Sequence, residues 1–241
     1  MDPVHTLAIV NVVAKVMSRP MSLVCSNLST ESNSLMQTSI MGDSLMSNQQ
    51  VLSRKQNLAN NLVDKRWVSM MKNPANGFID DNKIDIHVSN NISKPFKKYS
   101  KRIIRKIDDV TGIKIKIINN VNKSDIIVEN VNNYDQFGID DNVNGLAYLD
   151  LSNMKMKATW LKVWNICNYN SNKNKCKVWN YTKTLITHEI LHTLGLSHPF
   201  GDGSIEGYDN TDTAMSYNFV DFSINNPLRR ADVMALQSIW G

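Results

Sequence analysis

The chain has 241 residues, 42% of them hydrophobic, so it is long enough for one sizeable core and an additional segment. A formal net charge of +5 is small for this length and gives no reason to expect a nucleic-acid partner. Three cysteines are too few for a disulfide-stapled scaffold, and no run approaches the about 18 apolar residues that a membrane span needs.

The N-terminal part favours an extension over a folded domain. Its apolar run from Leu7 to Val16 has no Lys or Arg before it and no small-x-small site after it, so a short amphipathic helix fits better than a secretory signal, although both interpretations stay open. Residues 18–76 are rich in Ser, Asn, Gln and Met, which indicates weak structure or a pro-segment. We therefore predict an extension over residues 1–76 and a globular domain over residues 77–241.

The next two segments have the periodicity of a strand and of a helix. Ile84–Val88 alternates apolar and polar residues, and His87 lies on the polar side, where we expect solvent rather than a metal. A helix is predicted from Ser93 to Asp109, because apolar residues recur there at helical spacing. Its basic residues are interpreted as a solvated face, with an acidic partner or a membrane surface as the alternative. They are Lys94, Lys97, Lys98, Lys101, Arg102, Arg105 and Lys106.

Four strand candidates follow, at Ile113–Ile117, Ser124–Val128, Leu146–Leu151 and Thr159–Trp164. Between the second and third, Gly138–Gly145 is dense in Asp, Asn and Gly. Its oxygens could hold Ca²⁺, but the same residues are ordinary turn formers, which we favour.

A polar loop bracketed by Cys167 and Cys176 comes next, and the two thiols either close a small ring or stay free. Asn180 or Thr182 is expected to cap the following helix, which is predicted to run to Leu194.

That helix carries a metal-binding pattern. His188 and His192 are four residues apart, so they project from one helix face and can bind one ion. Glu189 then lies beside the metal, where it can take a proton from a metal-bound water. Gly195 is expected to adopt the left-handed conformation that ends the helix and returns His198 as a third ligand. Three imidazoles leave one position of a tetrahedral zinc open, which is typical of catalytic sites.

The whole motif, H-E-x-x-H-x-x-G-x-x-H at residues 188–198 with a downstream Thr213–Tyr217, resembles the metzincin clan of zinc proteases. Leu194–Pro199 and Met215–Tyr217 resemble the serralysin branch, with matrixins as near relatives. The C-terminal segment resembles the closing helix of these domains, in which an aspartate at the position of Asp232 supports the methionine turn. The resemblance covers roughly the last two thirds of the chain.

The resemblance implies an α+β fold: a twisted, mostly parallel sheet with an antiparallel edge strand, an active-site helix and a C-terminal helix. Leu146, Ala147 and Tyr148 would lie on the edge strand, to which an extended substrate adds itself. Met215 would form a hydrophobic base beneath the metal without ligating it. Tyr217 would stabilise the oxyanion of the transition state, with a structural tyrosine in the pocket wall as the alternative.

The chain also departs from these relatives. It contains no G-G-x-G-x-D calcium repeats of the kind that follow serralysin domains, and only His5 and His87 lie outside the motif, too few for the additional zinc of matrixins. Cys25 could block the zinc as a matrixin pro-segment cysteine does, but it lacks the flanking Arg and Gly of that switch, and a small buried or free residue is the alternative. Latency and calcium binding stay open.

We therefore expect a secreted, monomeric zinc-dependent endopeptidase that takes a protein or peptide substrate, with one catalytic Zn²⁺ and neither nucleic acid nor a transmembrane segment. One alternative is a zinc-stabilised binding protein with little turnover. Another is an interaction protein that uses the basic helix. The presence of Glu189 favours the enzyme, because loss of the general base is the simplest way to inactivate such a site.

Overall fold

The computed structural model describes residues 47–73, 83–112, 114–132, 134, 143–150, 153–161, 172–201, 203, 206–218 and 228–241, and for residues 161 and 172–178 it describes the backbone alone. The helices are α4 (Asn48–Leu62), α5 (Lys65–Met71), α6 (Lys94–Thr111), α7 (Asn172–Thr193) and α8 (Arg230–Trp240), with short 3₁₀ turns η2 (Val121–Lys123) and η5 (Pro199–Gly201). The strands are β1 (Lys83–Val88), β2 (Lys114–Ile118), β3 (Ile126–Val131), β4 (Gly145–Asp150) and β5 (Lys155–Leu161).

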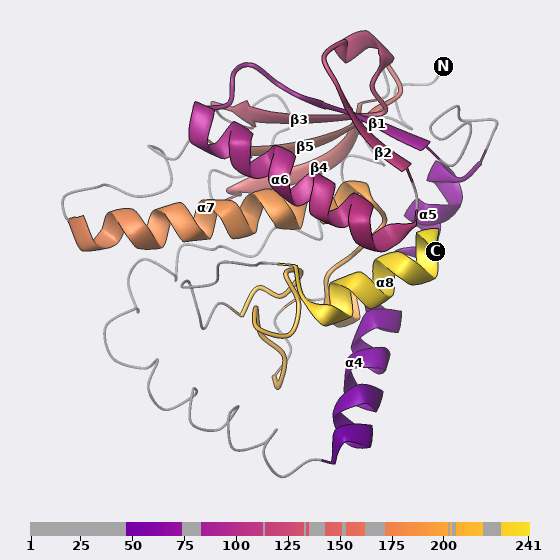
Figure 1. The fold of residues 1–241 in the computed structure, drawn as a ribbon. Coiled ribbons are helices and arrows are strands. Elements are labelled where there is room, and N and C mark those ends of the chain that lie inside the picture. Colours follow the sequence, from indigo (N-terminus) through magenta and orange to yellow (C-terminus); the bar gives the residue numbers. More distant parts are fainter. Residues whose placement is uncertain are drawn as a thin grey trace.

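The five strands form one mixed sheet in the order β2-β1-β3-β5-β4. Three of the four pairings are parallel, and β4 lies antiparallel to β5 at the edge. This mostly parallel sheet with an antiparallel edge strand agrees with that part of the sequence prediction. Helices α6 and α7 lie on the same face of the sheet (Figure 1), where their apolar residues join those of the strands in one core.

Strand β1 and helix α6 form for the reasons that the sequence indicates. Along β1 the apolar positions are buried and the polar ones half-buried, and His87 places its Nδ1 3.2 Å from the carbonyl oxygen of Ile118, away from the histidine cluster. Ser93 precedes α6, and Gly112 ends it in the left-handed conformation at φ 75°. The seven basic residues of α6 form no ion pair within the part of the chain that the structure describes.

Two element starts differ from the sequence prediction by four residues or more. Strand β5 begins at Lys155, four residues before Thr159, because Met156 and Ala158 supply its buried face. Helix α7 begins at Asn172, so the prediction that Asn180 or Thr182 caps it is wrong. The carbonyl of Asn180 accepts a bond from the Thr184 hydroxyl at 3.2 Å, which is helix-interior geometry. Asn and Thr are frequent at helix caps, but this preference is too weak to end or restart a helix that began several residues earlier.

Residues 47–73, which the sequence analysis placed in the extension, form α4 and α5. Leu58, Leu62 and Met71 are buried in the same core as the sheet and α8. The apolar face of α4 is narrow and interrupted by Asn and Gln, so its periodicity is weak, and tertiary packing supplies the burial. One local signal was present: Ser47 and Gln50 form a capping box at its start.

Other predictions concern residues outside this description: the segment 1–46 with Cys25, the loop 138–142, and Cys167 with the side chain of Cys176. None of the described helices is long and apolar enough to cross a membrane.

Candidate metal centre

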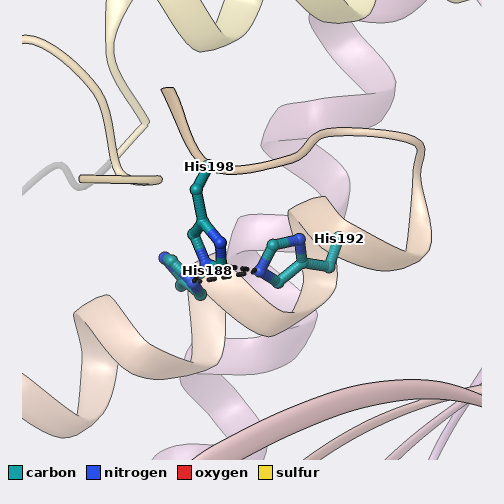
Figure 2. A group of neighbouring side chains, drawn as sticks. All are labelled: His188, His192 and His198. Carbon is teal, nitrogen blue, oxygen red and sulfur yellow. Dashed lines mark hydrogen bonds between the residues drawn. The ribbon is translucent and has the colours of Figure 1, made fainter. Parts of the chain in front are cut away.

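The C-terminal end of α7 and the turn after it carry the three histidines. Gly195 has a φ of 101° and ends the helix as the sequence predicts, with its N–H donating to the carbonyl of His192 at 3.1 Å. Leu196 N–H donates to the Leu191 carbonyl at 3.1 Å, so the chain reverses within a few residues. His198 consequently returns to the face of α7 that carries His188 and His192 (Figure 2).

The three imidazoles meet at their Nε2 atoms. Each of the three Nε2–Nε2 distances is 3.1 Å, and the nitrogens form a nearly equilateral triangle. Two nitrogens bound to one tetrahedral zinc at about 2.0–2.1 Å lie about 3.3 Å apart, so this spacing fits such an ion. Within the described residues these histidines could hold a metal ion.

Hydrogen bonds on the opposite side of the rings decide which nitrogens carry protons. His188 Nδ1 donates to the carbonyl of Ala214 and His192 Nδ1 to that of Leu196, both at 2.8 Å. A carbonyl only accepts, so these two neutral rings keep lone pairs on Nε2. At most His198 can donate into the triangle, and the lone pairs of the other two face each other. A cation between them relieves that repulsion.

Burial disfavours protonation of the three histidines, so a proton does not serve as that cation. Desolvation, with a smaller contribution from neighbouring His192, lowers the pKa of His188 to about 3. Desolvation also lowers the pKa of His192 to about 4 and places that of His198 well below its ordinary value. The three rings are therefore neutral at pH 7, which is the protonation state that ligates a metal.

Glu189 is fully buried beside this cluster, and among the described residues neither of its carboxylate oxygens has a hydrogen-bond partner. Desolvation raises its pKa well above the ordinary value. Gly145, the first residue of the edge strand, lies next to the Glu189 carboxylate. A Cβ built at Gly145 would lie only 2.8 Å from the Glu189 Cδ. The sequence analysis placed Gly145 in a turn and missed this contact, which no local pattern announces.

The turn at Thr213–Tyr217 supports the first ligand. Met215 is fully buried, and its predecessor Ala214 supplies the carbonyl that orients His188. Asp232 at the start of α8 accepts from the Thr213 hydroxyl at 2.5 Å and from the Ala214 N–H at 3.1 Å. The expected support of the turn by this aspartate is therefore present. Desolvation raises the pKa of Asp232 to about 6, against the lowering effect of these hydrogen bonds.

Tyr217 packs on the third ligand. Its ring centroid lies 4.3 Å from that of His198, and its hydroxyl lies 3.5 Å from His198 Nδ1, on the side of the ring away from the nitrogen triangle. The position depends on Gly203, whose φ is 77° and whose carbonyl accepts from Tyr217 N–H at 2.6 Å. A Cβ at Gly203 would lie 2.7 Å from the tyrosine ring, so this glycine is a second site residue that the sequence analysis missed.

Comparison with known proteins adds little to this geometry. No family model matches the sequence, and no curated protein does. Among solved structures, a chain of the "GM1 bound form of the ECX AB5 holotoxin" is similar, with 15% identity over 66% of this chain and 80% of that chain and a TM-score of 0.42. A likeness this weak supports no conclusion about function, which must be argued from the site.

Proposed function

We propose that this protein is a zinc-dependent endopeptidase with the metzincin arrangement of ligands. One observation carries the proposal: three neutral imidazoles converge on one point beside a buried carboxylate that has no hydrogen-bond partner among the described residues. A structural zinc site is closed by four protein ligands, whereas the described residues offer three at this cluster. An unpaired buried carboxylate is costly to keep, which favours a role in the chemistry over a role in stability.

The site residues have different roles in the proposed reaction. The three histidines would hold the zinc, which would supply a Lewis acid for the scissile carbonyl and would lower the pKa of a bound water. Glu189 is the general base, and desolvation raises the pKa of its carboxyl well above the ordinary value, which makes the carboxylate a stronger proton acceptor. Tyr217 is the proposed oxyanion donor, and its hydroxyl must move from the Nδ1 side of His198 to serve that role.

The edge strand supports a peptide as substrate. Strand β4 pairs with β5 along one side, and no described strand pairs with its other side. An extended peptide can therefore add to Leu146, Ala147 and Tyr148 through main-chain hydrogen bonds. Gly145 at the start of the same strand touches Glu189, so a peptide bound along β4 would pass close to the general base.

The test is hydrolysis of a mixed peptide library by the full-length protein, with the cut sites mapped by mass spectrometry. Glu189→Gln keeps the volume of the side chain and removes its basicity, so we expect a loss of about 10²–10⁴ in rate with zinc still bound. A chelator should abolish the same cuts, and re-added zinc should restore them. Zinc binding without any cutting would reject the protease and leave a metal-stabilised binding protein.

A further inference from the structure

We infer that the short segment between α4 and α5 positions two of the three metal ligands, so that residues 47–73 belong to the metal centre and are not a removable extension. We call Leu62, Val63 and Asp64 the clamp. The inference rests on the metal-binding part of the proposed function and does not depend on hydrolysis.

The clamp pairs with the turn that follows α7. Asp64 N–H donates to the carbonyl of Gly195 at 2.9 Å, and Ser197 N–H donates to the carbonyl of Leu62 at 2.7 Å. Between these bonds Val63 and Leu196 form an antiparallel bridge. Three consecutive residues of the turn are thus held by three consecutive residues of the clamp.

The clamped turn controls two ligands. The carbonyl of Leu196 is the acceptor that orients the His192 ring, and the residue after the clamped stretch is His198. Acceptors that orient a metal-bound imidazole commonly change metal affinity about 10–100-fold when they are lost. A turn that shifts by a fraction of an ångström moves the Leu196 carbonyl and the His198 ring together.

The clamp is itself anchored in the core. Leu62 of α4 is buried, and in α5 the Val68 side chain packs so closely on the turn that a Cβ at Gly195 would lie 2.7 Å from its Cγ2. From the other end of the chain, Trp240 Nε1 donates to the carbonyl of Leu194 at 3.0 Å. Figure 1 shows α5 beside the C-terminal end of α8. The turn is therefore gripped by both ends of the described chain.

A matched pair of variants isolates one clamp bond. Asp64 has a φ of −81°, which proline can adopt, and Val63 at φ −79° and ψ 115° is compatible with a following proline. Asp64→Pro removes the N–H that donates to Gly195. Asp64→Ala keeps that N–H, and both variants lose the Asp64 carboxylate that caps α5. The difference between the two variants therefore reports the clamp bond.

The readouts are the Zn²⁺ dissociation constant, from competition with a chromophoric chelator, and the unfolding temperature of the metal-free protein. We expect Asp64→Pro to bind zinc about 10-fold more weakly than Asp64→Ala. Leu58→Ala is the stability control, because Leu58 is buried in α4 outside the clamp, and the substitution should lower the unfolding temperature with little effect on zinc affinity.

Equal zinc affinity of Asp64→Pro and Asp64→Ala would overturn the inference, and so would an affinity loss in Leu58→Ala as large as that in Asp64→Pro. If Asp64→Pro does not fold, Val68→Ala takes its place, since it removes packing on Gly195 and no backbone bond. It should weaken zinc binding more than Leu58→Ala although it deletes fewer atoms, and the reverse order overturns the inference. Absence of peptide cutting would reject the protease alone.

Discussion

The histidine motif at residues 188–198 and the clamp at residues 62–64 meet at the same turn, yet only the motif can be recognised in the sequence. Each defining residue of the motif is specified by its own chemistry, as a candidate ligand, the proposed base or a left-handed glycine. The clamp acts through backbone N–H and C=O groups, which every residue except proline possesses in full. A site can therefore be half visible in a sequence: the part that works through side chains is seen, and the part that works through the backbone is not.

Removing a ligand should have the largest effect in this comparison. His192→Ala leaves two imidazoles, and we expect zinc affinity to fall by more than the about 100-fold upper range of an orienting residue, with hydrolysis lost. His87→Ala is the control, because His87 is bonded to Ile118 in the sheet. Zinc titration with a competing chelator measures both variants. A loss no greater than that of Asp64→Pro would mean that motif and clamp contribute alike.

Acid should destabilise the metal-free protein through the motif. In the unfolded chain the histidines bind protons below the ordinary pKa of 6.5. In the folded protein the pKa of His188 is about 3 and that of His192 is about 4. The stability present above pH 6.5 is therefore lost as the pH falls toward 4, by an amount on the order of several kcal/mol.

Asp232 acts in the opposite direction in the same experiment. Its folded pKa of about 6 is raised, so its contribution is present below 3.8 and is lost as the pH rises through 6. Glu189, whose pKa is also raised, acts in the same direction as Asp232, and we expect the three histidines to outweigh these two carboxyls. Denaturant unfolding of chelator-treated protein at pH 7.5 and pH 4.5 measures the balance, and a stability that rises on acidification would show that the two carboxyls dominate.

Disturbing the contact between β4 and Glu189 should have an effect on stability and activity that is smaller than the loss of a histidine. Gly145→Ala forces a methyl group against the Glu189 carboxylate, which should cost about 1–3 kcal/mol of unfolding free energy. Displacement of the base should also lower kcat/KM, by up to about 10²-fold.

A double-mutant cycle separates this contact from a general effect on the strand. In a Glu189→Ala background the methyl group has space, so Gly145→Ala should cost much less there. Leu185 Cδ1 also lies 2.7 Å from the built Cβ, and a residual cost from it is expected. Equal costs in the two backgrounds would rule out a direct contact between the edge strand and the base.

The smallest effect is expected at Arg54 in the N-terminal half of α4. The Arg54 guanidinium lies 4.9 Å from the Tyr208 ring centroid and 3.8 Å from an Asp212 oxygen, and it donates to the carbonyl of Gly207. Arg54→Ala should cost about 1 kcal/mol or less of stability. Zinc affinity should not change, because these contacts lie outside the clamp. A loss of affinity would extend the positioning role along the whole of α4.

Much of the sheet was predictable because local patterns there agree with the tertiary structure. The alternation in β1 and the helical spacing of Phe96, Tyr99, Ile103 and Ile107 each match a buried face in the structure. The start of α7 was not predictable in the same way. Its first turns are rich in Asn and Lys and carry no apolar stripe, so the cap preference of Asn180 and Thr182 was the strongest local signal, and it was misleading.

The sequence by itself determined the identity of the candidate metal ligands and of the proposed base, because residue type and spacing on one helix decide which groups can share an ion. It also predicted the left-handed turn at Gly195, and the resemblance to metzincins implied that Asp232 supports the methionine turn. Only the tertiary structure decided that Gly145 makes room for Glu189, that Gly203 makes room for Tyr217, and that Leu62–Asp64 grips the turn before His198. These contacts depend on the space that a glycine leaves by lacking a side chain and on hydrogen bonds between backbone groups. Neither leaves a pattern in a sequence.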